Sequence, residues 1–361
     1  MISIRWTVSR HGCTDTPGDR LIAMNHVHLI LPDLFLPRQY AAQASDDLVL
    51  PALQKLLARA TATSASSARS IEAALCAAFA VQVHNDIPVA PISAAFDGLG
   101  QGVWLRADAV HLRLQRDRML LSQPSVTRAE AGQFCAGLNE YFAAQGMTFF
   151  APHPQRWYVR VERVPDMQTT PLSEVMGGNV RGALPRGTDA PRWNRVFNES
   201  QMLLHAHPLN AAREARGELP VNSLWFWGGG EASRLQKNYD SVSSDEQWTR
   251  MFAAAAGVPY APAGGSLTPI LFCGERGDCL LLLGALREAI QAGDLHGWRV
   301  ALQAFETDVA RPLWDALRGG ELASLRIDVL AGENTRSLVL TRRDVYRFWR
   351  RGKRLAAYSM V

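Results

Sequence analysis

The chain has 361 residues, of which 47% are hydrophobic and 20% charged, and its formal net charge is +4. These proportions are ordinary for a globular protein and exclude a disordered chain, a collagen-like repeat and a coiled coil. The small net charge gives no argument for nucleic-acid binding by itself. The length predicts two domains, or one large α/β domain that carries an insert.

The ends and the cysteines bear on location. The five cysteines are widely spaced and form no CxxC pair, which favours a reducing cytoplasm. The apolar runs are far shorter than the ~20 residues of a membrane helix, so we expect no membrane contact. Residues 1–23 are polar and lack a clear period, and we expect them to be an N-terminal extension before a plausible natural start at Met24.

The first predicted strand is the apolar run Val27 to Leu31, which ends at Pro32 and Asp33. Such a run is typical of a buried parallel strand with functional groups just past its C-terminal end. Leucines at helical spacing predict a helix over 48–60, and an alanine-rich stretch predicts another over 71–83. Glycines and prolines over 88–102 indicate a long connection.

The hydrophobic pattern changes after about residue 102. Residues 110–114 and 157–162 alternate between apolar and polar, as half-exposed strands do. Between them, Thr127 and Glu130 have the spacing of a capping box, which predicts a helix to about residue 144. This strand–helix–strand pattern predicts a small α+β unit.

The remaining elements follow from periodicity. We expect irregular structure over 165–191, a helix over 193–205 and a strand over 223–227 that runs into Gly228, Gly229 and Gly230. Later we expect helices over 245–256, 281–292 and 298–317, a strand over 325–330 and a basic, aromatic helix over 342–351.

One segment carries a family resemblance. The run HPLNAAREARGELPVNSLWFWGGG, from His207 to Gly230, resembles H-P-x-N-x-x-R-x-x-x-G-x-x-P-x-N-x-x-W-x-W-G-x-G of the archaeal-type cofactor-independent phosphoglycerate mutases, which belong to the alkaline phosphatase superfamily. Weaker matches occur in the same order, over 51–59, 106–131 and 298–317. The block over 106–108 and the FWRR ending resemble the RpfE-type bacterial regulatory proteins most.

The resemblance covers residue 24 to the end and implies an α/β fold. We expect an alkaline-phosphatase-like core, with a central mostly parallel sheet flanked by helices, over 24–100 and 222–361. A smaller inserted α+β domain is expected over 101–221.

The departures from the family concern its metals. Active members carry a D-G-x-x-D element after the first strand, and here only Asp33 occupies a metal-binding position. The late motifs H-x-E-A-x-D-x-x-x-H and D-H are absent. Asp33, Glu275, Asp278 and Glu333 could supply oxygen ligands, but no histidine matches the late positions. A two-metal site needs several such groups to converge, so we expect the metal chemistry to be lost or strongly altered. The resemblance places the phosphoryl-accepting serine near 61–67 without fixing which residue it is.

Seven residues are candidates for ligand binding. Gly228, Gly229 and Gly230 could admit an anion to backbone N–H groups after a buried strand, or they could form a tight turn. Near them, a polar cluster could bind phosphate or carboxylate, or could be a buried network that holds the insert on the core. This cluster comprises His207, Asn210, Arg213 and Asn222.

Three further patterns are open. His26 and His28 share one side of a strand and could bind zinc. Arg10-His11-Gly12 has the R-H-G of histidine phosphatases. The arginines over 342–354, interleaved with aromatic residues, could bind nucleic acid or an acidic partner, or could simply form a solvated helix end.

The sequence therefore favours a regulatory or ligand-binding protein that accepts a small anion bearing phosphate or carboxylate and needs no cofactor. The alternative is an active phosphomutase or phosphatase with a rearranged Mn or Zn site around Asp33. A second alternative is a binder of nucleic acid or an acidic partner through the C-terminal helix, although nucleic acid is not the expected partner.

Overall fold

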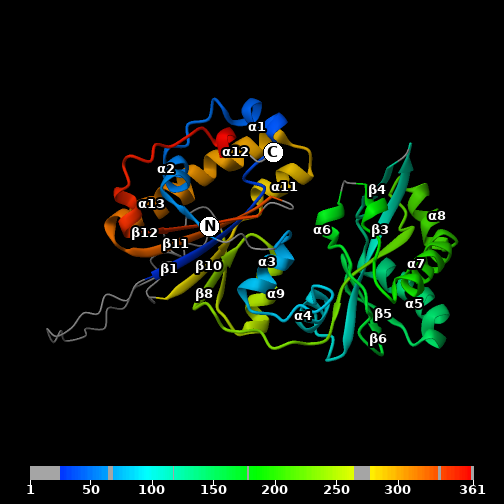
Figure 1. Ribbon diagram of the computed structural model, residues 1–361. Coiled ribbons are helices and arrows are strands. Elements are labelled where there is room, and N and C mark those ends of the chain that lie inside the picture. The colour runs from blue at the N-terminus through cyan, green and yellow to red at the C-terminus, as the bar shows by residue number, and fades with distance from the viewer. Residues whose placement is uncertain are drawn as a thin grey trace, which may run out of the picture.

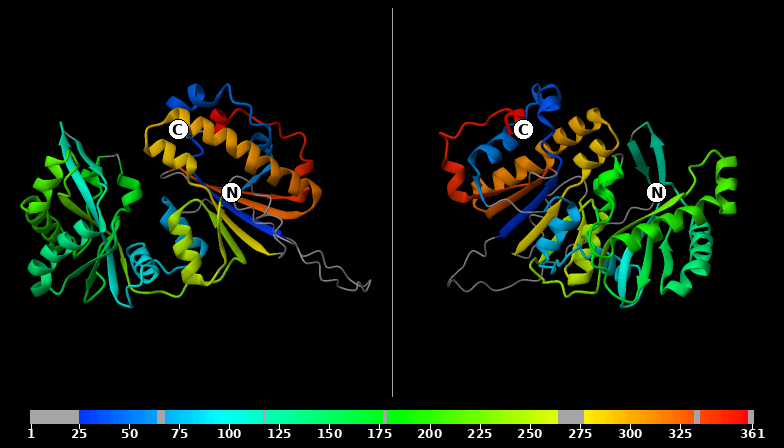
Figure 2. Two further views of the ribbon diagram at one scale, coloured as in Figure 1. Left: turned by 180° about the vertical axis from the view of Figure 1, so that it is seen from behind. Right: turned by 45° about the vertical axis from the view of Figure 1, so that its right-hand side comes forward.

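The computed structural model describes residues 25–63, 68–116, 118–176, 179–263, 277–331 and 335–358. These residues form two lobes, each built around its own β-sheet (Figures 1 and 2). The fold is mixed α/β, as the sequence predicts. No helix among the described residues is long and apolar enough to cross a membrane.

The larger lobe, called the core lobe below, has a seven-stranded sheet in the order β2-β12-β11-β1-β10-β8-β9. The neighbours β11, β1, β10, β8 and β9 run parallel, while β12 and β2 add antiparallel pairs at one edge. The strands are β1 (Asn25–Pro32), β2 (Thr61–Ala62), β8 (Ser241–Ser244), β9 (Tyr260–Pro262), β10 (Asp278–Leu282), β11 (Leu322–Leu330) and β12 (Arg336–Thr341).

Helices cover both faces of this sheet, because its central strands are apolar on both sides. Leu29 of β1 belongs to the core on one face and Ile30 to the core on the other. His26 and His28 therefore share the face of Ile30, as the alternation predicts. The first face packs against α1 (Arg38–Ser45), α2 (Pro51–Arg59), α11 (Ala285–Gln291), α12 (Leu295–Phe305) and α13 (Arg311–Gly319), and the second against α3 (Ile71–Ala78) and α9 (Gln247–Ala256).

The smaller lobe has a five-stranded antiparallel sheet centred on one long strand, β3. Helices α5 and α7 pack on it, and α5 begins with the capping box that the sequence predicts. The elements are β3 (Val103–Gln115), β4 (Arg118–Ser122), α5 (Arg128–Phe142), β5 (Thr148–His153), β6 (Arg156–Val161), α6 (Leu172–Val175), α7 (Ala190–His205), α8 (Pro208–Ala215) and β7 (Ser223–Gly230).

Strand β7 corrects the expected organisation. We placed residues 222–230 in the core, but β7 pairs antiparallel with β3 and so belongs to the smaller lobe. Between the lobes lies α4 (Val89–Phe96), which contacts β3 and β7 on one side and α9 on the other. Strands β3 and β7, the first and last strands of the smaller sheet along the chain, thus both contact α4 at one junction between the lobes.

Two predicted helices are also wrong in part. Residues 281–282 end strand β10, and the helix begins only at Ala285, because a run of apolar leucines fits a buried strand as well as a helix. The basic segment over 342–351 forms only a short 3-10 turn, Arg342–Tyr346, and then continues without helix. Its three aromatic side chains are exposed, so no apolar face holds it as a helix.

The predicted amphipathic helix over 298–317 forms as α12 and α13, joined by a π-helical segment over Glu306–Ala310. That segment directs the buried carboxylate of Glu306 at the start of α2. Its Oε1 accepts from the N–H of Ala52 and its Oε2 from the N–H of Leu53, both at 2.8 Å. Leu50, before α2, provides no side-chain cap, so Glu306 supplies the acceptors that the helix start lacks.

We expect Glu306→Ala to lower the free energy of unfolding by about 2–3 kcal/mol, because it leaves two buried N–H donors unsatisfied. Glu306→Gln should cost less, since its amide oxygen still accepts from one of them. Chemical denaturation followed by circular dichroism measures both values. Equal losses for the two variants would contradict the capping role.

Candidate functional site

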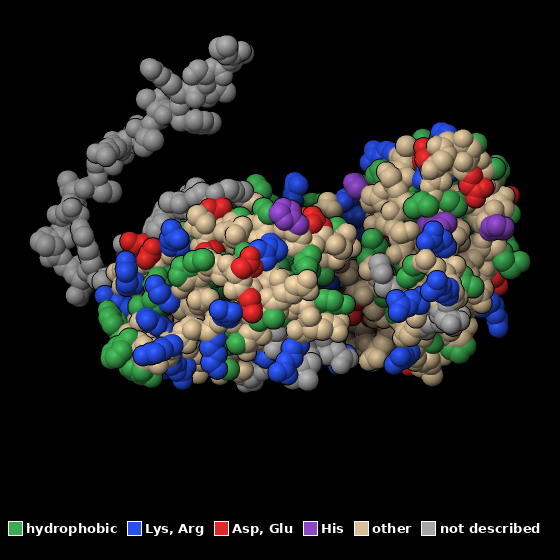
Figure 3. Space-filling model, turned by 90° about the horizontal axis from the view of Figure 1, so that it is seen from above, with side chains coloured by type: hydrophobic (Ala, Val, Ile, Leu, Met, Phe, Trp, Pro, Cys, Tyr) green, Lys and Arg blue, Asp and Glu red, His purple; other side chains and the backbone are tan. Residues whose placement is uncertain are grey.

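A cleft of about 290 Å³ lies between the two lobes and takes residues from both. The space-filling view shows the lobes side by side with a groove between them (Figure 3). The smaller lobe contributes Arg106, Asp108, Gln123, Gln155, Arg156, Leu172, Ser173, Met176 and Trp227, and the core lobe contributes Ile71, Glu72, Glu246, Gln247, Trp248, Met251, Arg287 and Gln291. These segments are far apart in the sequence, so only the fold brings them together.

Arg106 is buried at the inner end of the cleft. Its Nε donates to Asp108 Oδ1 at 3.2 Å and its Nη2 pairs with the same carboxylate. The guanidinium carbon lies 5.1 to 5.7 Å from the ring centres of Tyr158, Trp227 and Trp248. Its Nη1 is buried and has no hydrogen-bond partner among the described residues. A buried donor without a partner is costly, so this nitrogen lacks an acceptor that the described part of the chain does not supply.

Arg156 stands beside Arg106 on the same wall and is arranged in the same way. Its Nε and Nη2 form a bidentate pair with Asp97, at 2.8 and 2.6 Å. The hydroxyl of Tyr158 donates to the same carboxylate at 2.6 Å. Burial by itself raises the pKa of Asp97, but the bonds from Arg156 and Tyr158 outweigh it and leave that pKa below its ordinary value. Arg156 Nη1 is likewise buried without a partner.

The opposite wall belongs to the core lobe and centres on Arg287. Its Nη2 lies 3.4 Å from the carbonyl oxygen of Ser173, and its Nε is buried without a hydrogen-bond partner. Beside it, Glu72 is fully buried and accepts from Ser173 Oγ at 3.0 Å through Oε2. Its other oxygen, Oε1, has no partner. Ser173 lies in α6, so this short helix of the smaller lobe contacts the core lobe across the cleft (Figure 1).

Glu246 adds a titratable group to the core wall. Burial, and then the negative charges of Asp245 and Glu72, raise its pKa to about 7, against the opposing effect of Arg287. Burial and Glu72 also raise the pKa of Glu174. With its pKa near 7, Glu246 can gain or lose its proton near neutral pH.

Asp33 directly follows β1, at the carboxyl end of the parallel strands, and its backbone is left-handed (φ 54°). Its Oδ2 lies 3.8 Å from Nε of Arg287, and burial raises its pKa although Arg287 opposes the shift. Within the described ranges, no three His, Cys, Asp or Glu side chains converge as a metal site. A fixed guanidinium beside Asp33 also opposes a bound cation, so these residues do not fit a two-metal centre. The other expected oxygen donors Glu275 and Glu333 lie outside the described residues. Asp278 lies at the start of β10, at the opposite end of the parallel strands from Asp33.

We expected the three candidate glycines to follow the strand, where they could form a turn. They are instead the last residues of β7. The N–H of Gly228 donates to Thr169 Oγ1 and that of Gly229 to Asp86 Oδ2, both at 3.0 Å. A Cβ on Gly228 or Gly230 would lie 2.7 or 2.5 Å from atoms of Val89 and Pro88 respectively. Close packing against Val89 and Pro88 accounts for Gly228 and Gly230, and the N–H groups of Gly228 and Gly229 already have partners.

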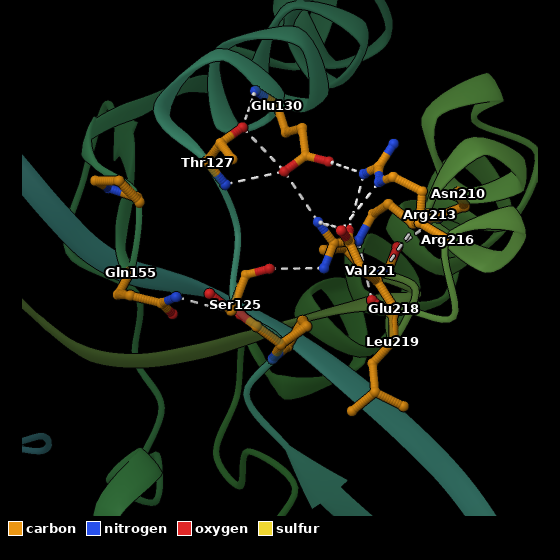
Figure 4. A network of polar contacts seen from close by, with 12 residues as sticks. Ser125, Thr127, Glu130, Gln155, Asn210, Arg213, Arg216, Glu218, Leu219 and Val221 are labelled. Atoms are coloured by element: carbon orange, nitrogen blue, oxygen red, sulfur yellow. Dashed lines mark hydrogen bonds and ion pairs between the residues drawn. The ribbon is translucent and has the colours of Figure 1, made fainter.

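Arg213 and Glu130 form a buried network within the smaller lobe (Figure 4). Arg213 Nη1 donates to Glu130 Oε2 at 2.9 Å, Nη2 to the Ser125 carbonyl at 2.6 Å and Nε to the Leu219 carbonyl at 3.0 Å. Arg216 contacts the other oxygen of Glu130 at 2.8 Å. The guanidinium of Arg213 thus has all its nitrogens engaged by protein atoms.

The other members of the predicted polar cluster also act within this lobe. Asn210 bonds both the carbonyl and the N–H of Val221, at 2.8 and 2.9 Å. Asn222 bonds the N–H and carbonyl of Leu112 in β3. His207 caps α8 and packs on Phe134, with ring centres 4.6 Å apart. The cluster joins α8 and the chain before β7 to the smaller lobe, and none of its members lines the cleft.

The remaining candidates fall elsewhere. His26 and His28 bond protein side chains, and no metal-ligand group is found around them in the described part of the chain. Arg10-His11-Gly12, residues 1–23 and positions 64–67 lie outside the described residues. Nothing in the sequence pointed to Arg156, Arg287 or Glu246 as site residues. Of the arginines of the cleft, only Arg106 was marked in the sequence, because it belongs to the block over 106–108 that carries a family resemblance.

No protein-family model matches the chain. It is 27% identical over 165 residues to a probable 2,3-bisphosphoglycerate-independent phosphoglycerate mutase of Geobacter sulfurreducens, which is 41% of each chain. It is 27% identical over 175 residues to the corresponding enzyme of Methanothrix thermoacetophila, which is 43% of this chain and 45% of the relative. The matched segments thus span less than half the length of these relatives.

Two solved structures share the fold over nearly the whole chain. The cofactor-independent phosphoglycerate mutase of Thermoplasma acidophilum has a TM-score of 0.50 at 13% identity, covering 94% of this chain and 95% of its own. The PH0037 protein of Pyrococcus horikoshii has a TM-score of 0.56 at 12% identity, covering 94% and 93%. The chain is therefore similar in sequence, over less than half its length, to 2,3-bisphosphoglycerate-independent phosphoglycerate mutases, and it shares the fold of these two solved structures.

Proposed function

We propose that this protein binds a small phosphorylated hydroxy acid, of which a phosphoglycerate is the simplest example, in the cleft between its lobes. We propose further that it acts as a ligand-binding, regulatory protein and does not carry out metal-dependent phosphoryl transfer. The sequence similarity supports the ligand class, since the similar proteins are named as phosphoglycerate mutases.

The observation that carries this proposal is the pair of unpartnered guanidinium nitrogens, Arg106 Nη1 and Arg156 Nη1, on one wall. Each arginine uses its other two nitrogens to bind an aspartate, which fixes its orientation. A phosphate or carboxylate offers the oxygen acceptors that these two donors lack.

The other wall suits the rest of such a ligand. Among the described residues, Glu72 Oε1 is an acceptor without a hydrogen-bond partner, which a ligand hydroxyl can satisfy. Arg287 Nε has only the long ion pair with Asp33, at 3.8 Å, so it can still donate to a ligand oxygen. A protonated Glu246 would donate rather than repel. The cleft volume of about 290 Å³ matches a small metabolite rather than a nucleotide or a peptide.

The regulatory part of the proposal rests on the metal-binding positions. Asp33 faces Arg287 instead of a set of oxygen and nitrogen ligands, and the late histidine motifs of the family are absent from the sequence. A binding protein on this scaffold needs the arginine wall but not the metals.

Calorimetric titration of the full chain with 3-phosphoglycerate tests the ligand class. We expect Arg156→Lys to weaken binding at least tenfold, because lysine keeps the charge beside Asp97 but lacks the second, free arm of the guanidinium. A charged hydrogen bond contributes about 1.5–3 kcal/mol, which corresponds to a loss of roughly 10- to 150-fold.

Two variants serve as controls. Arg163→Lys changes an arginine of the same lobe that pairs with Asp189 and is 63% exposed, and it should leave affinity unchanged. Arg213→Lys disturbs the Glu130 network and should lower stability without a specific loss of affinity. Equal affinity in wild type and Arg156→Lys would remove Arg156 from the site.

Glu246 gives the binding a pH dependence. Its raised pKa of about 7 means that it gains a negative charge between pH 6 and 8, which opposes an anionic ligand. We expect the ratio of affinities, Glu246→Gln over wild type, to rise several-fold from pH 6 to pH 8.5. The ratio cancels the ionisation of the ligand's own phosphate, and a ratio independent of pH would contradict the assignment.

Turnover measurements test the regulatory part. We expect no mutase activity, and no phosphatase activity that depends on added Mn²⁺ or Zn²⁺, in the purified chain. Metal-dependent turnover that Asp33→Ala abolishes would show instead that the alternative function, an enzyme with a rearranged metal site, is correct.

A further inference from the structure

A second pocket, of about 390 Å³, lies on the core lobe among β1, β11, α3 and the segment before β8. It is lined by polar side chains from the first half of the parallel strands, whereas the cleft lies beyond their carboxyl ends. The polar lining residues are His26, His28, Asn238, Tyr239, Asp278, Ser324, Arg326 and Asp328.

Three of these side chains form a hydrogen-bonded series. The hydroxyl of Tyr239 lies 2.7 Å from Nδ1 of His28, and Nε2 of His28 lies 2.8 Å from Oδ2 of Asp328. Arg326 also binds Asp328, with Nε 3.1 Å from Oδ1 and Nη2 2.9 Å from Oδ2.

The charge on Asp328 fixes the direction of these bonds. Although burial raises its pKa, the bonds from His28 and Arg326 outweigh this and lower it to about 2. The carboxylate is therefore ionised and can only accept, so Nε2 of His28 carries a proton. In the neutral imidazole Nδ1 is then an acceptor, and the Tyr239 hydroxyl donates to it.

We propose that Tyr239, His28 and Asp328 form an activated tyrosine, with Tyr239 as the nucleophile, His28 as its general base and Asp328 as the group that orients the base. A nucleophile bonded to a base, which is in turn oriented by a third group, is the arrangement that activates hydroxyl side chains in covalent catalysis. Burial raises the pKa of the phenol to about 12, so its proton leaves only as the new bond forms.

The side chains around the triad indicate a phosphate ester as the substrate. Arg326 is 48% exposed and retains Nη1 beyond its two bonds to Asp328. His26 uses Nδ1 to bond Ser324 at 2.6 Å and retains Nε2. Both can hold the oxygens of a phosphoryl group.

The reaction balances without a further reactant except water. The Tyr239 oxygen bonds to phosphorus, its proton passes to His28 Nδ1, and the ester P–O bond breaks as the leaving oxygen takes that proton. Water then attacks the phosphotyrosine and gives a proton to His28. The bond from the tyrosine oxygen to phosphorus breaks, and the oxygen regains the proton. The sum is an ester and water giving an alcohol and phosphate.

Labelling of the full chain with an arylsulfonyl fluoride tests the nucleophile, with modified tyrosines located by peptide mass spectrometry. We expect Tyr239 to react at least tenfold faster than Tyr40 and Tyr346, although these are 53% and 61% exposed. His28→Gln should remove this advantage, and Asp328→Asn should reduce it, because an amide at 328 favours the wrong tautomer. The matched control is His296→Gln, in α12 and outside this pocket, which should leave the advantage of Tyr239 unchanged.

A second arm uses 4-nitrophenyl phosphate followed by an acid quench. We expect release of 4-nitrophenol and phosphate on Tyr239, both lost in Tyr239→Phe and both unchanged in Arg163→Lys, which alters an exposed ion pair of the other lobe. The proposal is wrong if Tyr239 in the folded wild type reacts no faster than Tyr346, a comparison that needs no variant. Fast sulfonylation without phosphotyrosine would overturn the phosphate ester as substrate.

Discussion

The buried ion pair of Arg106 and Asp108 is the interaction on which the arrangement of the two lobes depends. Both residues lie on β3, two positions apart, so they share one side of the strand. Asp108 also accepts from the indole of Trp227 at 2.8 Å, which ties β3 to β7. The Arg106 guanidinium reaches the ring of Trp248 in the core lobe. Removal of either charge would leave the other buried and uncompensated, which typically costs 3–5 kcal/mol.

This constraint bears on the place of the proposed ligand site. A buried guanidinium held by a carboxylate and by aromatic rings does not satisfy all its donors, and one nitrogen of Arg106, which lines the cleft, has no hydrogen-bond partner among the described residues. Arg156 is held in the same way, by an ion pair with Asp97. On the core side, Arg287 occupies the neighbourhood of Asp33, where the family resemblance implies a metal. The cleft therefore combines fixed cations with Glu246, a carboxyl group of raised pKa, a combination that suits the anion binding proposed above.

Local patterns in the sequence predicted much of the fold and little of the site. The capping box of Thr127 and Glu130 and the strand of Val27 to Leu31 were predictable because neighbouring residues decide them. Residues 281–282 were not, since an apolar run fits a strand or a helix equally. Arg156, Arg287 and Glu246 meet only after distant strands pair, which no local period encodes. The polar residues from His207 to Asn222 carried the family resemblance, yet the structure uses them to hold one lobe together.

The glycine end of β7 has a consequence for saturation mutagenesis. Gly228 has φ 69°, and a side chain at Gly228 or Gly230 would collide with the residues that start α4. Substitutions there would separate the lobe junction itself and so abolish every property of the protein together. A scan scored on function would rank these glycines with the most sensitive positions because of packing alone. Intolerance to replacement at Gly228 and Gly230 reports how closely Val89 and Pro88 pack on the strand, and soluble yield measured alongside function would separate it from a true binding defect.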